Sequence, residues 1–180
     1  MTSLIIADDD AIERQVPEVP VDVIISCGDI ADSVILRIAQ RCGCKKIFAV
    51  KGNHDSSASF PAPIHDLHLN RVKFRGLWLA GFCGSWKYKP RGNYLFEQDE
   101  VESLLSGFPA VDVFVAHNSP RLIHDKDDEV HHGFTAFNSY ITRMQPRWFI
   151  HGHQHTNIES TLEGTKIVGI FGYRFLVFPD

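Results

Sequence analysis

The sequence has no excess of positive charge and no low-complexity segment. Its 18 lysines and arginines stand against 22 aspartates and glutamates, which gives a net charge of −4 over 180 residues. Sequence-independent binding of DNA or RNA depends on clustered basic side chains that release counterions. We therefore do not expect a long nucleic acid as a partner, whereas a nucleotide-like ligand held by metal ions is compatible with this charge.

Targeting and membrane-spanning patterns are also lacking. The apolar stretch Ser3–Ala7 runs directly into three aspartates and has no basic segment before it, which is unlike a secretory signal. No apolar run approaches the roughly 20 residues that are needed to cross a bilayer. The expectation is a cytoplasmic protein that does not interact with a membrane.

Cysteine is scarce, with four residues at Cys27, Cys42, Cys44 and Cys83. Cys27 and Cys83 lie in apolar runs, as small core residues do. Cys42 and Cys44 flank one glycine, and two thiols at this spacing make a poor zinc site without further ligands. We expect four reduced, structural thiols, and a redox or metal-binding module built on Cys42 and Cys44 has only that pair to support it.

What the sequence does contain is a series of short apolar runs that end in polar residues. Runs of four or five β-branched and aromatic residues are too short for helices and indicate buried strands. Ligands of open α/β sheets collect beyond the carboxyl ends of strands, so the polar residues should converge. The runs are Leu4–Ala7 before Asp8, Val23–Cys27 before Gly28-Asp29, Ile47–Val50 before Gly52-Asn53-His54, Val113–Ala116 before His117, and Trp148–Ile150 before His151-Gly152-His153.

Helical periodicity fills the intervals between several of these runs. Apolar stripes predict helices over 34–42, with Asp32 as N-cap, over 101–108, and over 134–144 before Pro146. The stretch between Asp8 and Asp29 contains two prolines and predicts only a turn or loop. Segments 72–83 and 158–178 predict successive strands. We therefore expect one domain over 1–180, of α/β class, with two stacked sheets and helices outside.

Taken in order, the polar blocks resemble the calcineurin-like metallophosphoesterase superfamily, whose pattern is D-x-H, G-D, G-N-H-[D/E], H and G-H-x-H. Four of the five blocks match in full, and together they run from Asp8 to His155. The short chain and the block His117-Asn118-Ser119-Pro120 look like the compact, stand-alone branch of that superfamily. The resemblance implies a four-layer αββα sandwich of two mixed sheets flanked by helices.

The resemblance also implies a chemistry, the hydrolysis of a small phosphodiester or phosphomonoester by metal-activated water. Asp29 would bridge two divalent ions. The metal ligands implied are Asp8, Asp10, Asp29, Asn53, His117, His153 and His155, a mixed set that suits Mn²⁺, Fe²⁺ or Zn²⁺ better than Ca²⁺. His54 would be the catalytic acid that stabilises the phosphoryl oxygens and protonates the leaving alkoxide. Asn53, His54 and Arg91 are the expected substrate contacts.

The first block departs from the family pattern, because Asp10 stands where the family has a histidine. Asp10 could ligate directly as a carboxylate, which favours Mn²⁺ or Fe²⁺. It could reach the ion through water and so weaken that site, or Asp9 could take part with the block shifted by one. Extra negative charge near a phosphate opposes binding unless metal ions neutralise it. We expect one tight metal site and one loose site beside Asp10.

Two loops admit two interpretations each. Segment 85–94, which carries Arg91, is either a solvated excursion or a surface that contacts phosphate and base. Segment 124–133 is rich in aspartate and histidine and is either a solvated acidic loop or a lid over the metals.

The rival function is a non-catalytic, protein-binding scaffold on the same fold. Against it, Asn53, His54, His117, His153 and His155 are all present.

Overall fold

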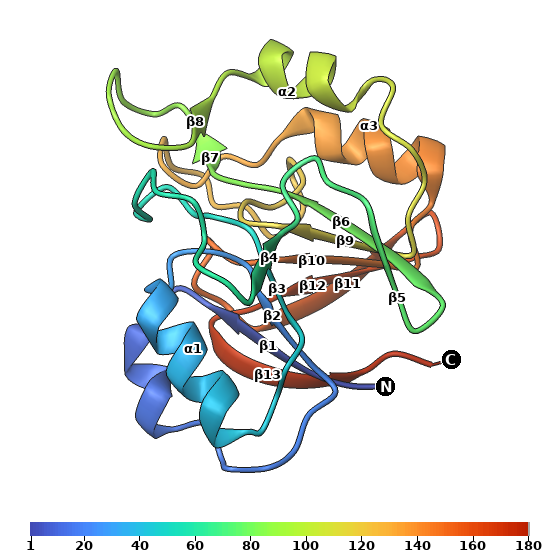
Figure 1. Cartoon of the computed structure of the whole chain (residues 1–180). Coiled ribbons are helices and arrows are strands. Elements are labelled where there is room, and N and C mark those ends of the chain that lie inside the picture. Colours follow the sequence, from blue (N-terminus) through green and yellow to red (C-terminus); the bar gives the residue numbers. More distant parts are fainter. Residues whose placement is uncertain (180) are drawn as a thin grey trace.

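The computed structural model describes residues 1–179 and shows four layers (Figure 1). One outer layer consists of the short 3₁₀ helix η1 (Asp10–Arg14) and α1 (Asp32–Arg41). Two stacked sheets follow, and α2 (Gln98–Leu105) and α3 (Thr135–Met144) cover the far side. The predicted αββα sandwich is confirmed. Among the described residues, no helix is long and apolar enough to cross a membrane.

Both sheets are mixed, as expected. The first has the order β13 (Gly172–Val177), β1 (Thr2–Ala7), β2 (Val23–Ser26), β3 (Ile47–Ala49) and β4 (Ile64–Asp66), and only β13 is antiparallel to its neighbour. The second has the order β11 (Ile158–Leu162), β12 (Thr165–Gly169), β10 (Trp148–His151), β9 (Val113–Ala116), β6 (Leu77–Phe82) and β5 (Val72–Phe74). Its four central strands are parallel, and its edge strands are antiparallel. A small third pair joins β7 (Ser85–Trp86) to β8 (Leu95–Phe96).

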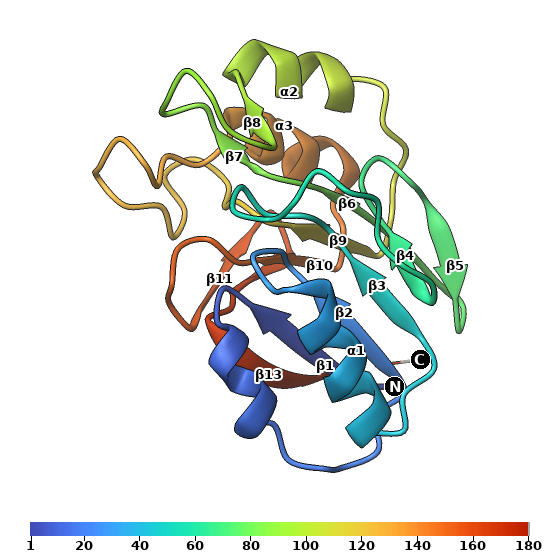
Figure 2. The ribbon, with the colours of Figure 1, turned by 60° about the vertical axis from the view of Figure 1, so that its left-hand side comes forward.

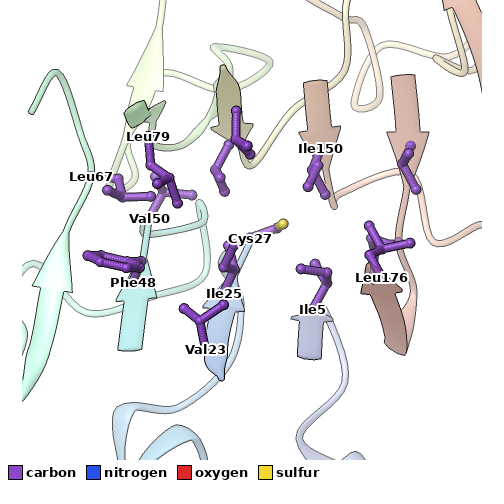
Figure 3. Packing of buried hydrophobic residues seen from close by; sticks show 14 of the residues in the cluster. Ile5, Val23, Ile25, Cys27, Phe48, Val50, Leu67, Leu79, Ile150 and Leu176 are labelled. Carbon is purple, nitrogen blue, oxygen red and sulfur yellow. The ribbon is translucent and has the colours of Figure 1, made fainter. Parts of the chain in front are cut away.

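Strand β1 shows why the apolar runs are continuous rather than alternating. Ile5 and Ala7 belong to the core between the two sheets, which Figure 3 shows from close by. Leu4 and Ile6 belong to the core between the first sheet and α1. Because both faces of the sheet are covered, every position of the strand after the exposed Thr2 is buried, which favours apolar residues.

The three predicted helices are present, with corrections to their bounds. The helix predicted over 101–108 is α2, which begins at Gln98 and ends at Leu105, so Phe108 lies beyond it. Asp32 is the first residue of α1 and not its N-cap, which is Ala31. The carboxylate of Asp32 instead pairs with Lys51 Nζ at 2.7 Å. The Ala31 N–H donates to Asp10 Oδ1 at 2.9 Å, so a residue 21 positions earlier satisfies the helix terminus. The proline-containing connection after β1 holds only the five-residue η1, as predicted.

Candidate metal centre

The segments that follow β1, β2, β3, β9 and β10 meet at one edge of the sandwich. The Asp8 N–H donates to Gly28 O at 3.3 Å, which joins the first two segments. The Gly152 N–H donates to His117 O at 3.0 Å, which joins the last two. The two sheets are linked by the His153 N–H, which donates to Asp8 Oδ2 at 2.8 Å. The predicted convergence of polar strand ends is therefore present.

Three side chains in this region form a group that could hold a metal ion. Ligand atoms of Asp29, His117 and His153 all lie within 4.8 Å of one another. His117 Nε2 is 3.3 Å from Asp29 Oδ2 and 3.0 Å from Asn53 Oδ1. Asn53, His117 and His153 are buried. A mixed set of imidazole, carboxylate and amide donors suits a first-row transition metal.

Main-chain carbonyls orient the two imidazoles of this group. His117 Nδ1 lies 2.8 Å from Cys27 O, and His153 Nε2 lies 3.2 Å from Val130 O. A carbonyl oxygen only accepts, so each of these nitrogens carries the proton. Nε2 of His117 and Nδ1 of His153 are then available to a metal. This arrangement, in which the second ring nitrogen donates to a carbonyl, is typical of histidines that bind metals.

Asp8 provides a separate test of whether a metal fits. Its side chain is fully buried, and Oδ1 has no hydrogen-bond partner among residues 1–179. The nearest cationic group is His117 Nδ1, at 3.9 Å from Oδ1. A buried carboxylate oxygen without a partner is costly, and a divalent ion would remove that cost. The donor set and this unpaired oxygen therefore fit the metal-dependent chemistry that the resemblance implies.

The charges of the site are strongly coupled. Burial raises the pKa of Asp8 to about 7. Burial also acts to raise the pKa of Asp29 and to lower that of His117. Their mutual attraction outweighs this, so that the pKa of Asp29 falls to about 2 and that of His117 rises to about 9. Metal ligands must be deprotonated. Metal binding at neutral pH therefore displaces protons from His117 and from part of the Asp8 population.

Four of the predicted ligands have an unusual backbone conformation. The φ angles of Asp8, Asp29, His153 and His155 are 63°, 53°, 64° and 49°. Non-glycine residues rarely adopt positive φ, and such strain clusters at functional sites.

Two glycines permit the close approach of the loops. A Cβ on Gly28, where φ is +95°, would lie 2.5 Å from Gly52 N and 2.8 Å from His117 Nδ1. A Cβ on Gly52 would lie 2.1 Å from Asp29 Oδ1. The glycine of each block is therefore required by the packing of the site and not only by a turn.

The Asp55 carboxylate connects the loops after β2 and β3. Its Oδ2 accepts from the Asp29 N–H at 2.9 Å and from the Gly52 N–H at 2.7 Å. We expect Asp55→Ala to lower metal affinity by about 10–100-fold, because Asp29 loses the contact that orients it. Titration of the metal-stripped protein measures this effect. Asp66→Ala is the control, since Asp66 also accepts from a main-chain N–H, that of His68 at 2.8 Å, at the exposed end of β4. Equal affinities in both variants would contradict the prediction.

The other predicted residues lie around this group. The main-chain N–H of His54 donates to Asp29 Oδ1 at 2.8 Å. His54 and Asp10 line a cavity of about 340 Å³ together with Asp29. His155 is exposed, and its ring centroid is 5.1 Å from that of Phe171. Arg91 is exposed on the loop between β7 and β8. The structure thus gathers Asp8, Asn53 and the three-residue group, with Asp10 and His54 beside it and His155 and Arg91 at the surface.

Sequence reasoning missed two residues near this site. Asn53 Nδ2 donates to the Tyr88 hydroxyl at 3.3 Å, and nothing in the sequence separates Tyr88 from the other aromatics of its loop. The ring of His131 lies 5.2 Å, centroid to centroid, from that of His153. The sequence signal for His131 was the density of aspartate and histidine in segment 124–133.

Comparison with known families agrees with this geometry. The profile of the calcineurin-like phosphoesterase superfamily domain matches residues 5–170. The chain therefore belongs to that superfamily, which is metal-dependent. A search of curated protein sequences gives no match.

Solved structures share the fold at low sequence identity. The protein TT1561 of Thermus thermophilus has a TM-score of 0.66 at 13% identity, over 95% of this chain and 89% of that chain. The phosphopantetheinyl hydrolase PptH from Mycobacterium tuberculosis has a TM-score of 0.63 at 14% identity, over 95% of this chain and 89% of that chain. Vps29 from Entamoeba histolytica in complex with Zn²⁺ has a TM-score of 0.51 at 12% identity, over 96% of this chain and 74% of that chain. At such identities the likeness establishes the fold alone.

Proposed function

We propose that the protein is a dinuclear, metal-dependent phosphoesterase that hydrolyses a small phosphodiester or phosphomonoester. The observation that carries this proposal is the buried group Asp29, His117 and His153 beside the unpaired carboxylate oxygen of Asp8. Membership of a phosphoesterase superfamily supports hydrolysis over other uses of such a group. The likeness to PptH, whose name is that of a hydrolase, is consistent with it.

We assign the ligands of one ion to Asp29, Asn53, His117 and His153. The other ion would be held by Asp8, Asp29 and His155, with Asp10 beside it. Mn²⁺, Fe²⁺ or Zn²⁺ suits these donors. When bound, such a pair of ions supplies an activated water and neutralises charge on the phosphoryl group. Asp29 is the carboxylate common to both sets.

His54 is the residue we assign to acid catalysis. His54 lines the same cavity as Asp29 and interacts electrostatically with that carboxylate, which supports a position beside the bound ester. There it would stabilise the phosphoryl oxygens and protonate the leaving alkoxide. We assign Asn53 and Arg91 to substrate contact as well. The cavity of about 340 Å³ and the net charge of −4 favour a small ester, nucleotide-like in size, over a long nucleic acid.

All four cysteines are free and buried, which supports placement in the cytoplasm.

The second candidate function is a non-catalytic scaffold that binds protein partners. One observation favours it: Asp10 replaces the family's histidine, and its Oδ1 accepts from the Ala31 N–H, so the carboxylate serves a helix terminus. The likeness to Vps29, which is named for protein sorting, is consistent with this candidate. A scaffold need not keep a buried, unpaired carboxylate such as that of Asp8, which is the observation against it.

Turnover decides between the two. Metal-stripped protein would be given Mn²⁺, Fe²⁺, Zn²⁺, Ni²⁺ or Mg²⁺ and assayed with a chromogenic phosphodiester and the matching monoester. We expect metal-dependent hydrolysis that Asn53→Ala abolishes, because that substitution removes an amide ligand. Hydrolysis of neither ester with any of the metals would favour the scaffold.

The Asp10 position makes a further prediction about metal affinity. A calorimetric titration of the metal-stripped protein with Mn²⁺ should show one tight and one weak site, because Asp10 is engaged with Ala31. Asp10→His restores the family pattern and should tighten the weak site. Two equal, tight sites in the unsubstituted protein would show that Asp10 ligates as well as a histidine does.

A further inference from the structure

We propose that His131, on loop 124–133, is an additional substrate contact that hydrogen bonds to the phosphate group of the bound ester, and that Asp128 positions it. This inference rests on the proposed function and deepens it. It assigns a residue outside every block of the family pattern. Figure 2 shows the loop, gold in colour, projecting on the left-hand side of the ribbon.

The loop is docked onto the metal centre through consecutive carbonyl groups. Val130 O lies 3.2 Å from His153 Nε2. The next carbonyl, that of His131, accepts from Gln154 Nε2 at 2.9 Å, and that of His132 accepts from Asn118 Nδ2 at 2.7 Å. Gln154 and Asn118 are buried. Because buried side chains hold three successive peptides, this part of the loop is not a freely solvated excursion.

The base of the loop is anchored as well. The carboxylate of Asp125 forms an ion pair with Arg121 and accepts from the Gly133 N–H at 3.2 Å. The beginning and the end of the loop are thus joined through one side chain. Both the base and the 130–132 stretch hold the loop against the site, which gives His131 a defined position.

The ring of His131 lies beside two predicted metal ligands. Its centroid is 5.2 Å from that of His153 and 6.2 Å from that of His155. The side chain is 21% exposed, so the ring is accessible to a small ligand from solvent. His54 follows β3 of the first sheet, whereas His131 belongs to the loop after β9 of the second. A phosphate at the ions would therefore meet an imidazole from each half of the molecule.

Asp128 fixes the orientation of this ring. Its Oδ2 is 2.8 Å from His131 Nδ1, and its Oδ1 accepts from the main-chain N–H groups of Val130 at 2.9 Å and His131 at 2.8 Å. These contacts lower the pKa of Asp128, with the His131 N–H as the largest cause, so the carboxylate is ionised. Nδ1 therefore carries a proton toward Asp128. Within residues 1–179, Nε2 has no hydrogen-bond partner and is left for a ligand.

The pairing of Nδ1 with Asp128 leaves Nε2 of His131 for a ligand, and this arrangement serves a metal ion as well as a phosphate oxygen. The charge of the site favours the substrate contact, and the metal content of His131→Ala separates the two. The site is otherwise crowded with carboxylates, those of Asp8, Asp29 and Asp55. An anionic ester in such surroundings needs hydrogen-bonding groups that are not themselves acidic. His131 supplies one at the rim of the site.

The test compares His131→Ala and Asp128→Asn with His132→Ala, which removes an imidazole from the same loop but keeps the carbonyl that docks it. All would be measured as metal-loaded, full-length proteins. The readouts are metal content, kcat and KM for the chromogenic ester, and the Kd of inorganic phosphate. We expect His131→Ala to keep both metals, to lower kcat/KM by about a hundredfold and to weaken phosphate binding by about tenfold.

Asp128→Asn keeps an acceptor oxygen for the two main-chain N–H groups. A positioning role predicts that it raises KM more than it lowers kcat, whereas His132→Ala leaves both unchanged. Loss of a metal ion in His131→Ala would overturn the proposal, because His131 would then be a ligand. Unchanged kinetics and phosphate affinity would also overturn it. If the unsubstituted protein hydrolyses neither ester, the proposed function fails, and the phosphate titration still decides the role of His131.

Discussion

His54→Ala is expected to keep the metal content of the unsubstituted protein and to lose turnover by about 10²–10⁴-fold, the range of general acid catalysis. The reason lies in how His54 is attached to the site. Its link to Asp29 is a main-chain N–H that donates to Oδ1 at 2.8 Å, and alanine preserves this hydrogen bond. Only the imidazole of this cavity-lining residue is removed. Elemental analysis and steady-state kinetics on the same samples measure both quantities.

The control is His65→Ala, which removes an exposed imidazole from β4, where its ring lies against Phe48 at 5.6 Å between centroids. It should change neither metal content nor kcat. A leaving group with a low pKa needs little protonation, so the loss in His54→Ala should shrink with such an ester. Loss of metal in His54→Ala would refute the assignment of this residue to acid catalysis and make it a ligand.

Gly28→Ala is expected to have the largest effect on stability, a loss of more than about 4 kcal/mol in the free energy of unfolding. The added Cβ would lie 2.5 Å from the main-chain nitrogen of Gly52, which belongs to the next loop of the candidate metal centre. A main-chain atom cannot move aside as a flexible side chain can. The loops that carry Asp29 and Asn53 would have to separate, so metal affinity should fall as well.

Gly43→Ala separates this clash from backbone strain. Gly43 also has positive φ, +61°, but a Cβ there meets nothing within 4 Å. Its substitution should therefore cost only the conformational strain of about 1–2 kcal/mol and leave metal binding unchanged. Chemical denaturation of both metal-stripped variants gives the two free energies. Equal losses would mean that strain alone, and not the approach of the two loops, accounts for Gly28.

Much of the fold was predictable because both faces of each sheet are covered. In the first sheet β2 and β3 are buried throughout and β1 is buried from Ser3 to Ala7, so runs such as Leu4–Ala7 and Ile47–Val50 stand out in the sequence as uninterrupted apolar segments. The helical stripe of 34–42 likewise reflects one buried face, and α1 contains it except for Cys42, which is the C-cap. The expected N-cap Asp32 was wrong because a long-range ion pair with Lys51 competes for its carboxylate. Such a pairing leaves no local signal.

The ligand types of the candidate site were also determined by the sequence. Aspartate, asparagine and histidine follow successive buried strands, and parallel strands place their carboxyl ends at one edge. Asp29, His117 and His153 come together for this reason, although the chain separates the first from the last by more than a hundred residues. The positive φ angles of Asp29 and His153 could not be foreseen, because they are imposed by the packing of one loop against another.

Tertiary structure alone decided the relations between the loops. The sequence contains Gly28, Asp55 and His131 but does not say what each lies against. Asp55 accepts hydrogen bonds from two loops, Gly28 provides space for the second loop, and His131 reaches His153 because buried side chains hold the carbonyls of its own loop. The apolar pattern of a strand is a local property, because the burial of the strand requires apolar residues at consecutive positions. Contacts between loops depend on the relative placement of two sheets, which no local pattern encodes.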